Sequence, residues 1–424
     1  MTNAQDPVGA AAAARPVRGV PPLREHGMPP LVLMTTFAFA GFAVMLPVAP
    51  MHMVAVGGGT FLSGLVNAAL MGATILTQVG VERARAVLGW RVSLMLACLL
   101  LGAPALLEIV ANAPWQIIAL AAVRGIGFGI ITVSGSSALA ALFPPERRGR
   151  AIGEYGLAVA GAQLVLTPAA PWIADTAGFP IALAVAGLPL VGIPFALSAG
   201  GAIEQHTRGA VPAPAPAAGS NGEAETNRHA LMRLWAPILA LVVVTCAGGA
   251  ITTFAPQFVP GTTLTVVSLL VYTAAAMLAR WLSGGLADRY GARRFVLPGL
   301  GLAVLGLAAI AASIAGVTGP VAPVVLVAGA ILVGSSFGTM QNVTLVRSFE
   351  LAGEHAKGVA STAWNVAFDA GTGVGALAIG ALASRTSFSF SFLMLMVLSL
   401  AAAAVLLANG RRAKRPPALA ETAA

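Results

Sequence analysis

Two ionisable side chains lie inside long apolar stretches of this sequence, and their types and positions are the first indication of chemistry. Asp369 lies near the middle of the apolar segment 357–383, and Arg124 lies within the apolar segment 115–142. An ionisable group in such surroundings costs several kcal/mol, so each is a candidate for function. A buried carboxyl group that alternates between protonated and ionised forms can carry a proton, which makes Asp369 the first candidate for that role. The alternative is that Asp369 is a static partner of a polar neighbour such as Asn365 or Arg124.

A second group of polar side chains also lies within the apolar segments and could contact a small solute. Any one of them could instead form a hydrogen bond between two helices. The cavity that they would line carries few charges, which suits an amphiphilic or hydrophobic solute better than a sugar phosphate or a dicarboxylate. The candidates are Asn67, Gln163, Gln257, Gln341, Asn342, Trp364 and Asn365.

A tight cluster of charges and glycines interrupts the apolar pattern within residues 281–299. The glycines permit a close approach of helices and a turn with positive φ. Asp288 can satisfy unpaired N–H groups at the start of a neighbouring helix, and the arginines can anchor at the lipid headgroups or pair with acids. The alternative is that these are only loop charges on the cytoplasmic side. The cluster comprises Gly284, Gly285, Asp288, Arg289, Gly291, Arg293 and Arg294.

The composition shows which elements must position these residues. The chain has 424 residues, of which 58% are hydrophobic and 9% are charged. A soluble domain needs about a quarter of its residues charged to cover its surface. Apolar segments of 18 residues or more are typical of membrane-spanning helices, and strands with period-two alternation do not occur here. We therefore expect an all-α membrane protein.

Twelve spans can be placed along the sequence, with a polar, Pro-rich linker after the sixth. The predicted organisation is a disordered cytoplasmic tail over 1–29, a six-helix bundle over 30–199, a cytoplasmic linker over 200–234, a second six-helix bundle over 235–409, and a cytoplasmic tail over 410–424. The predicted spans are 30–51, 60–80, 89–109, 115–142, 150–174, 179–199, 235–256, 263–285, 295–315, 320–346, 357–383 and 388–409.

The basic residues predict the orientation of these spans. If the N-terminus is cytoplasmic, all 24 Lys and Arg residues fall in cytoplasmic segments except Arg385 in an outer loop and Arg124 inside a span. This bias supports an even number of spans with both termini cytoplasmic. The acids Asp175 and Glu108 are expected at the outer interface.

The two halves of the chain also resemble each other. Residues 124–129 (RGIGFG) align with 333–338 (VGSSFG), and 148–151 (RGRA) align with 357–360 (KGVA). This alignment matches the fourth span with the tenth and the fifth with the eleventh. Duplicated halves on either side of a linker are typical of secondary transporters, in which the substrate site lies near the midplane between the halves.

The segment GGLADRYGARR, residues 284–294, resembles the cytoplasmic loop motif of the major facilitator superfamily in its second-half copy. The resemblance implies two six-helix bundles and a loop that latches them together while the protein faces outward. It places Asp288 near the start of the fifth span, between Arg150 and Glu154, with Glu154 as a partner of an arginine. The first-half copy, QVGVERARAVLGWR, has Ala86 where the family has Asp.

Two further motifs indicate the branch of this family. AVRGIGFG resembles a motif whose arginine, here Arg124, is linked in proton-coupled exporters to proton transfer or substrate binding; a structural arginine bonded to backbone carbonyls is the alternative. GAQLVLTPAAPW resembles the antiporter motif at Pro168, although Pro171 and Trp172 replace its paired glycines. The resemblance is therefore closest to the drug/metabolite:proton antiporter branch, with Asp369, Arg124 and Glu154 as proton-coupling candidates.

These features predict a proton-coupled secondary transporter that exports a small organic solute by alternating access; an importer or a uniporter is the alternative within the same class. A membrane-embedded enzyme is the alternative from another class, but the five histidines fall in tails, loops or span ends. We expect an inner-membrane monomer whose partners are the lipid bilayer, a small-molecule substrate and protons. The charge of +9 is scattered between spans, so we expect no nucleic acid, and no residue pattern calls for a metal or cofactor.

Overall fold

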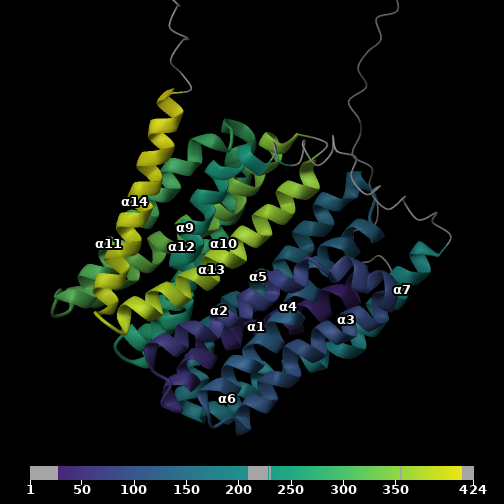
Figure 1. The fold of residues 1–424 in the computed structure, drawn as a ribbon, viewed down its shortest axis with the longest axis horizontal. Helices are drawn as coiled ribbons and strands as arrows, with labels where there is room; N and C mark the ends of the chain where they lie inside the picture. The colour runs from purple at the N-terminus through teal and green to yellow at the C-terminus, as the bar shows by residue number, and fades with distance from the viewer. Residues whose placement is uncertain (1–26, 209–227, 229–230, 354–355, 413–424) are drawn as a thin grey trace, which may run out of the picture.

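The computed structural model describes residues 27–208, 228, 231–353 and 356–412, and its regular elements are helices (Figure 1). Within these described residues, twelve helical crossings are long and apolar enough to span a membrane. The N-terminal half contains α1 (Met28–Ala55), α2 (Gly59–Gln78), α3 (Val81–Leu107), η2 (Glu108–Val110), α4 (Pro114–Leu142), α5 (Pro145–Ala177), α6 (Phe179–Ala186), η3 (Leu188–Gly192) and α7 (Ile193–Thr207). The C-terminal half contains α9 (Trp235–Phe258), α10 (Thr262–Tyr290), α11 (Arg293–Ala315), α12 (Val321–Ala352), α13 (Lys357–Ala383) and α14 (Phe388–Arg412).

Each predicted span coincides with one of these crossings, but several helices continue past the predicted ends. Helix α10 runs on to Tyr290, so the expected charged turn is reduced to Gly291 and Ala292 before α11 begins. Helix α7 continues to Thr207, so the first residues of the predicted linker are helical. Helix α14 likewise continues into the predicted C-terminal tail as far as Arg412, and residues 1–26, 209–227, 229–230 and 413–424 of the predicted tails and linker lie outside the described residues.

The sixth crossing is interrupted where the sequence predicted a continuous span. Helix α6 ends at Ala186, and the 3-10 helix η3 connects it to α7. Pro189 lies in η3, where its ring and missing N–H disfavour a regular helix. Helix α1 packs tightly against this interruption, since a Cβ added to Gly41 would lie 2.4 Å from the carbonyl oxygen of Ala186. The irregular backbone is therefore buried within the protein, as membrane depth requires.

The two halves form two six-helix bundles that lie side by side, purple to blue and green to yellow in Figure 1. The first has one apolar core, which runs from Met28 to Ile203, and the second has its own core clusters. Equivalent glycines make equivalent contacts in the two bundles. A Cβ on Gly125 of α4 would lie 2.2 Å from the Leu70 oxygen of α2, and one on Gly334 of α12 would lie 2.3 Å from the Tyr272 oxygen of α10. Small residues let these helix backbones approach closely.

The end of the molecule at which α1 begins and α14 ends is here called the basic end, because Arg and Lys gather at the helix termini there. The other end is called the opposite end. Successive crossings run in opposite directions, so every second connection between helices lies at the basic end. The described basic residues near helix termini at the basic end are Arg83, Arg85, Arg91, Arg147, Arg148, Arg150, Arg208, Arg228, Arg233, Arg289, Arg293, Arg294, Arg347 and Lys357.

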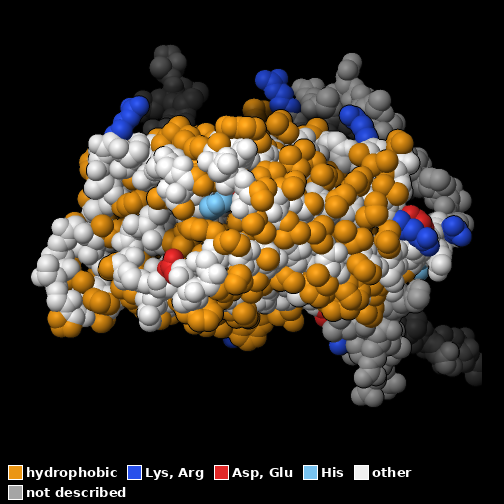
Figure 2. All heavy atoms as spheres, turned by 90° about the horizontal axis from the view of Figure 1, so that it is seen from below, with side chains coloured by type: hydrophobic (Ala, Val, Ile, Leu, Met, Phe, Trp, Pro, Cys, Tyr) orange, Lys and Arg blue, Asp and Glu red, His pale blue; other side chains and the backbone are white. Residues whose placement is uncertain are grey.

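The surface between the two ends is apolar. Figure 2 shows hydrophobic side chains across the middle of one face, with Lys and Arg at its edges. Large apolar side chains such as Leu76 and Trp281 are largely exposed. A soluble protein rarely exposes contiguous apolar surface of this extent, whereas lipid-facing helices require it.

The two bundles meet toward the opposite end. Thr262 of α10 donates a hydrogen bond to Asp175 of α5 at 2.5 Å, and Asn67 of α2 donates to Thr253 of α9 at 2.9 Å. Helices α2 and α13 touch so closely that a Cβ on Gly64 would lie 2.3 Å from the Ala376 oxygen. These contacts join the two bundles toward the opposite end.

Candidate functional site

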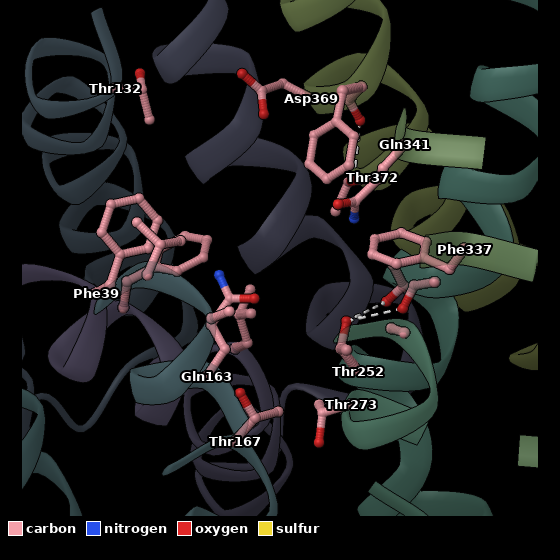
Figure 3. Close-up of a pocket in the computed structure, with 18 of the residues that line it drawn as sticks. Phe39, Thr132, Gln163, Thr167, Thr252, Thr273, Phe337, Gln341, Asp369 and Thr372 are labelled. Atoms are coloured by element: carbon pink, nitrogen blue, oxygen red, sulfur yellow. Dashed lines mark hydrogen bonds between the residues drawn. The ribbon is translucent and has the colours of Figure 1, made fainter. Parts of the chain in front are cut away.

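A cavity of about 260 Å³ lies between the bundles. Four helices of each bundle line it: α1, α2, α4 and α5 from the first, and α9, α10, α12 and α13 from the second. Its side chains project from both halves toward the same space, as Figure 3 shows for Phe39 and Gln163 on one side and Phe337 and Gln341 on the other. The contacts at the opposite end close the cavity there, and its lining extends toward the basic end.

Asp369 is the carboxylate in this lining, and its partner comes from the other bundle. Its side chain projects from α13, is 5% exposed, and accepts a hydrogen bond of 2.8 Å from Nε2 of Gln78 at the end of α2. The static partners that the sequence suggested are not the ones found. The Asn365 amide donates instead to the Ser361 oxygen on its own helix, and Arg124 does not line the cavity. The Asp369 carboxylate is thus itself part of a contact between the two bundles.

Aromatic side chains form a wall on each side of the cavity. In the first bundle, Phe42 stacks on Phe128 with ring centroids 3.9 Å apart, and Phe39 packs edge-on against both. In the second bundle, Trp364 stacks on Phe368 at 5.6 Å. Such rings offer large apolar contact areas with defined geometry. A solute between these walls would meet an apolar ring surface on both sides and an acid at one edge.

Four of the seven predicted cavity residues lie in the lining: Gln163, Gln341, Trp364 and Asn365. The Trp364 indole also donates a hydrogen bond to Thr344 at 2.9 Å. The other three residues, Asn67, Gln257 and Asn342, do not belong to the lining.

The three residues outside the lining have other surroundings. Asn67 is buried at the seam between the bundles, where it donates to the Leu46 oxygen as well as to Thr253. Asn342 donates to the Arg280 oxygen, because consecutive helical residues point about 100° apart and only Gln341 faces the cavity. Gln257 lies near the end of α9, at the opposite end and beyond the lining.

The lining also contains polar residues that the sequence did not single out, notably Gln78, Thr132 and Arg280. Arg280 was assigned to a cytoplasmic segment, but it lies inside α10 and donates a hydrogen bond of 2.9 Å to Gln341. The sequence could have indicated this location, because Arg280 lies about three turns before the end of that helix. Gln78 gave no such signal, because its role depends on an acid far away in the sequence.

The sequence profile of the Major Facilitator Superfamily matches residues 31–376 and 269–423 of this chain. The chain belongs to the Major Facilitator Superfamily. It is accordingly an integral membrane protein that moves a small-molecule substrate by alternating access, and not an enzyme. No curated protein matches the sequence.

Solved structures support the fold of this superfamily member. A bacterial homologue of the human lysosomal transporter Spinster, inward-facing and unoccupied, has a TM-score of 0.72 and 17% identity over 94% of this chain and 100% of its own. The nucleoside transporter NupG has a TM-score of 0.69 and 14% identity over 90% and 99%. A peptide transporter, POT, in complex with sulfate, has a TM-score of 0.67 and 16% identity over 94% and 96%.

The charged cluster of this superfamily member lies at the basic end, away from the cavity. Asp288 and Arg289 are exposed in the last turn of α10, and Arg293 and Arg294 are exposed in the first turn of α11. Gly291 between them has φ 85°, a conformation that glycine adopts without strain. Gly89, at the matching place in the first-half copy, has φ 78°. The turn geometry is therefore duplicated even though the aspartate is not.

The three predicted proton-coupling residues lie in three different places. Asp369 lines the cavity, whereas Glu154 is near the basic end of α5, where it pairs with Arg150 at 3.1 Å. Arg124 is fully buried in α4, and its guanidinium nitrogens have no hydrogen-bond partner among the described residues. Its buried position agrees with the family motif, but its bonding is not that of an arginine satisfied by backbone carbonyls.

Proposed function

We propose that this protein is a proton-coupled antiporter that exports a small amphiphilic or hydrophobic organic solute. The proposal assigns it to the drug/metabolite:proton antiporter branch of its superfamily. The observation that carries it is the position of Asp369, a buried acid in the cavity whose partner, Gln78, belongs to the other bundle. The carboxylate of Asp369 can therefore bind a proton and contact the solute, and its protonation changes the hydrogen bond that joins the two bundles.

The composition of the lining supports an amphiphilic solute. Two aromatic walls face the cavity, and the polar groups between them are mostly uncharged amides and hydroxyls, such as Gln163 and Thr252. Ligand pockets of this kind gain affinity from apolar contact and orientation from a few polar groups. Arg280 is the single cation among the described lining residues, so a solute with several negative charges, such as a sugar phosphate, would leave most of them unpaired, which is unfavourable.

The energy of the Gln78–Asp369 contact is large enough to control the conformational balance. A hydrogen bond to a charged group contributes about 1.5–3 kcal/mol, roughly twice the value for a neutral pair. Two conformations of a protein typically differ by a few kcal/mol, so protonation of Asp369 is enough to shift their populations. In the proposed cycle, Asp369 releases its proton in the state seen here, the solute binds, and the bundles rock to the other state.

The orientation follows from the basic end. Since Lys and Arg favour the cytoplasmic side, we place the basic end and both termini in the cytoplasm of a cell with the protein in its inner membrane. The structure then represents an inward-facing state, and Asp288 would latch to the start of α5 when the protein faces outward. We infer a monomer, because one chain already contains both halves of the cavity.

A reconstitution experiment tests the coupling. A thermal-shift screen of the purified protein first identifies solutes that bind. Proteoliposomes with a trapped pH indicator then receive a labelled solute with and without a pH gradient. Wild-type protein is expected to move solute and protons in opposite directions, and Asp369→Asn is expected to bind solute without pH-driven transport.

The matched control is Glu350→Gln, which removes an acid that pairs with Arg347 at the basic end and lies outside the cavity. This variant should retain coupled transport. Full pH-driven transport by Asp369→Asn would remove that residue from the mechanism. Solute movement that ignores the pH gradient in the wild type would instead favour a uniporter, and movement in the same direction as protons would favour an importer.

A further inference from the structure

The first bundle contains a second pair of ionisable groups, far from Asp369. His52 lies in the last turn of α1, and Glu108 lies where α3 passes into η2, both near the opposite end. The Nδ1 atom of His52 is 3.3 Å from Oε1 of Glu108. The two residues are 8% and 0% exposed, and the ring of Phe179 on α6 covers the imidazole at 5.0 Å. The sequence placed Glu108 at the outer interface; it lies near the opposite end, and the pairing with His52 accounts for its burial there.

The surroundings of this pair leave its charges incompletely satisfied. Oε2 of Glu108 is buried and has no hydrogen-bond partner among the described residues. Glu108 also acts electrostatically on the buried guanidinium of Arg124 on α4. Elements η2 and α6 add no other charge toward the pair, and Asp175 on α5 is turned to Thr262 instead. A buried carboxylate with one free oxygen and a single imidazole contact is a costly arrangement unless a proton can join it.

We propose that His52 and Glu108 form a second proton-binding site, separate from Asp369, in the part of the first bundle nearest the opposite end. One proton is shared by the imidazole nitrogen and the carboxylate oxygen that face each other. When the pair gains a proton, the negative charge that offsets Arg124 is neutralised. The site therefore switches the charge of this buried cluster by one unit.

A short connection links this cluster to the cavity. Arg124 and Phe128 are one helical turn apart on α4 and lie on the same face of that helix. Phe128 stacks on Phe42, and both rings line the cavity. A change of charge at the His52–Glu108 pair thus acts on Arg124, which lies one helical turn from an aromatic wall of the cavity. Asp369 lies in the lining of the cavity, whereas His52 and Glu108 lie outside that lining.

The test follows the imidazole of His52 by nitrogen NMR in the purified, full-length protein in lipid nanodiscs. His52→Gln identifies its signals among those of the five histidines. We expect the signals of His52 to respond to pH. This pH response should be lost or displaced in Glu108→Gln, which keeps the shape of the side chain, and should return in Glu108→Asp, which keeps the carboxylate. Asp369→Asn should leave it unchanged.

Several outcomes would overturn the proposal. Signals of His52 that ignore pH, or that respond identically in the wild type and in Glu108→Gln, would show that the pair does not share a proton. A response that changes in Asp369→Asn would show that the two sites are not separate. Circular dichroism and size-exclusion chromatography report whether each variant is folded. The measurement needs neither substrate nor transport, so its result is independent of the proposed export function.

Discussion

The contact between α2 and α13 offers a direct test of how the bundles move. Gly64 of α2 faces the backbone of Ala376 of α13, and a Cβ at that position would lie 2.3 Å from the Ala376 oxygen. Ordinary contacts of a Cβ begin near 3.4 Å. Gly64→Ala therefore requires the two helices to separate by about 1 Å at the end where the bundles are joined.

The size of the effect follows from this overlap. Overpacking of a close contact costs about 1–3 kcal/mol, and here the cost falls only on the state in which this end is closed. The ratio of the two states should then shift by about 5- to 150-fold toward the state that is open at the opposite end. Alanine also favours the helix by up to about 1 kcal/mol, but that gain is common to both states and cancels.

Spin labels at Val56→Cys and Ser384→Cys measure the separation of the bundles at this end. The native cysteines, Cys98 and Cys246, are buried and should remain unlabelled. Double electron–electron resonance is expected to show a longer distance between the two spin labels in the Gly64→Ala protein than in the wild type. Gly72→Ala is the matched control, because a Cβ on that residue of the same helix meets no atom within 4 Å. The same distance distribution in both variants would refute the steric argument.

Three further changes test the assignments at other positions. Asp288→Ala should alter the stability of the present state by no more than about 0.5 kcal/mol, because the side chain is exposed, while it should lower the population of the outward-facing state. Cysteine accessibility measured from both sides reports that balance, and unchanged accessibility would argue against a latch. Arg124→Met should reduce transport in proteoliposomes more than Arg385→Met, because only the first is buried; equal transport would contradict the role given to the motif arginine. Trp364→Ala should weaken solute binding by about 2- to 10-fold, since an aromatic pair contributes about 0.5–1.5 kcal/mol. Trp172 is exposed on α5, so Trp172→Ala should leave the dissociation constant unchanged.

Several features of the site could be predicted from sequence because they depend on local pattern. Asp369 was identified because an acid inside an apolar run has few structural explanations. The glycine at 291 was identified because a helix reversal at the membrane surface needs a residue that tolerates positive φ. The position of Glu108 along its span indicated its depth in the same way, but it did not show that His52 from another helix covers the side chain.

Amide residues were predicted less well than charges. Asn67 and Gln163 have the same chemistry and similar apolar neighbours in the sequence, yet one lies in the seam between bundles and the other lines the cavity. The difference is the rotation of each helix about its own axis. That rotation is set by packing against several other helices at once, and a hydropathy pattern that is apolar on every side does not report it.

The sequence by itself determined the class of protein, the number of crossings and the existence of two related halves. Hydrocarbon forces this outcome, because each crossing must be apolar and must satisfy its own backbone hydrogen bonds within one continuous stretch of chain. Only the tertiary structure decided which side chains meet. Gln78 and Asp369 are 291 residues apart, and their hydrogen bond exists only because the two bundles lie together with those two faces in register.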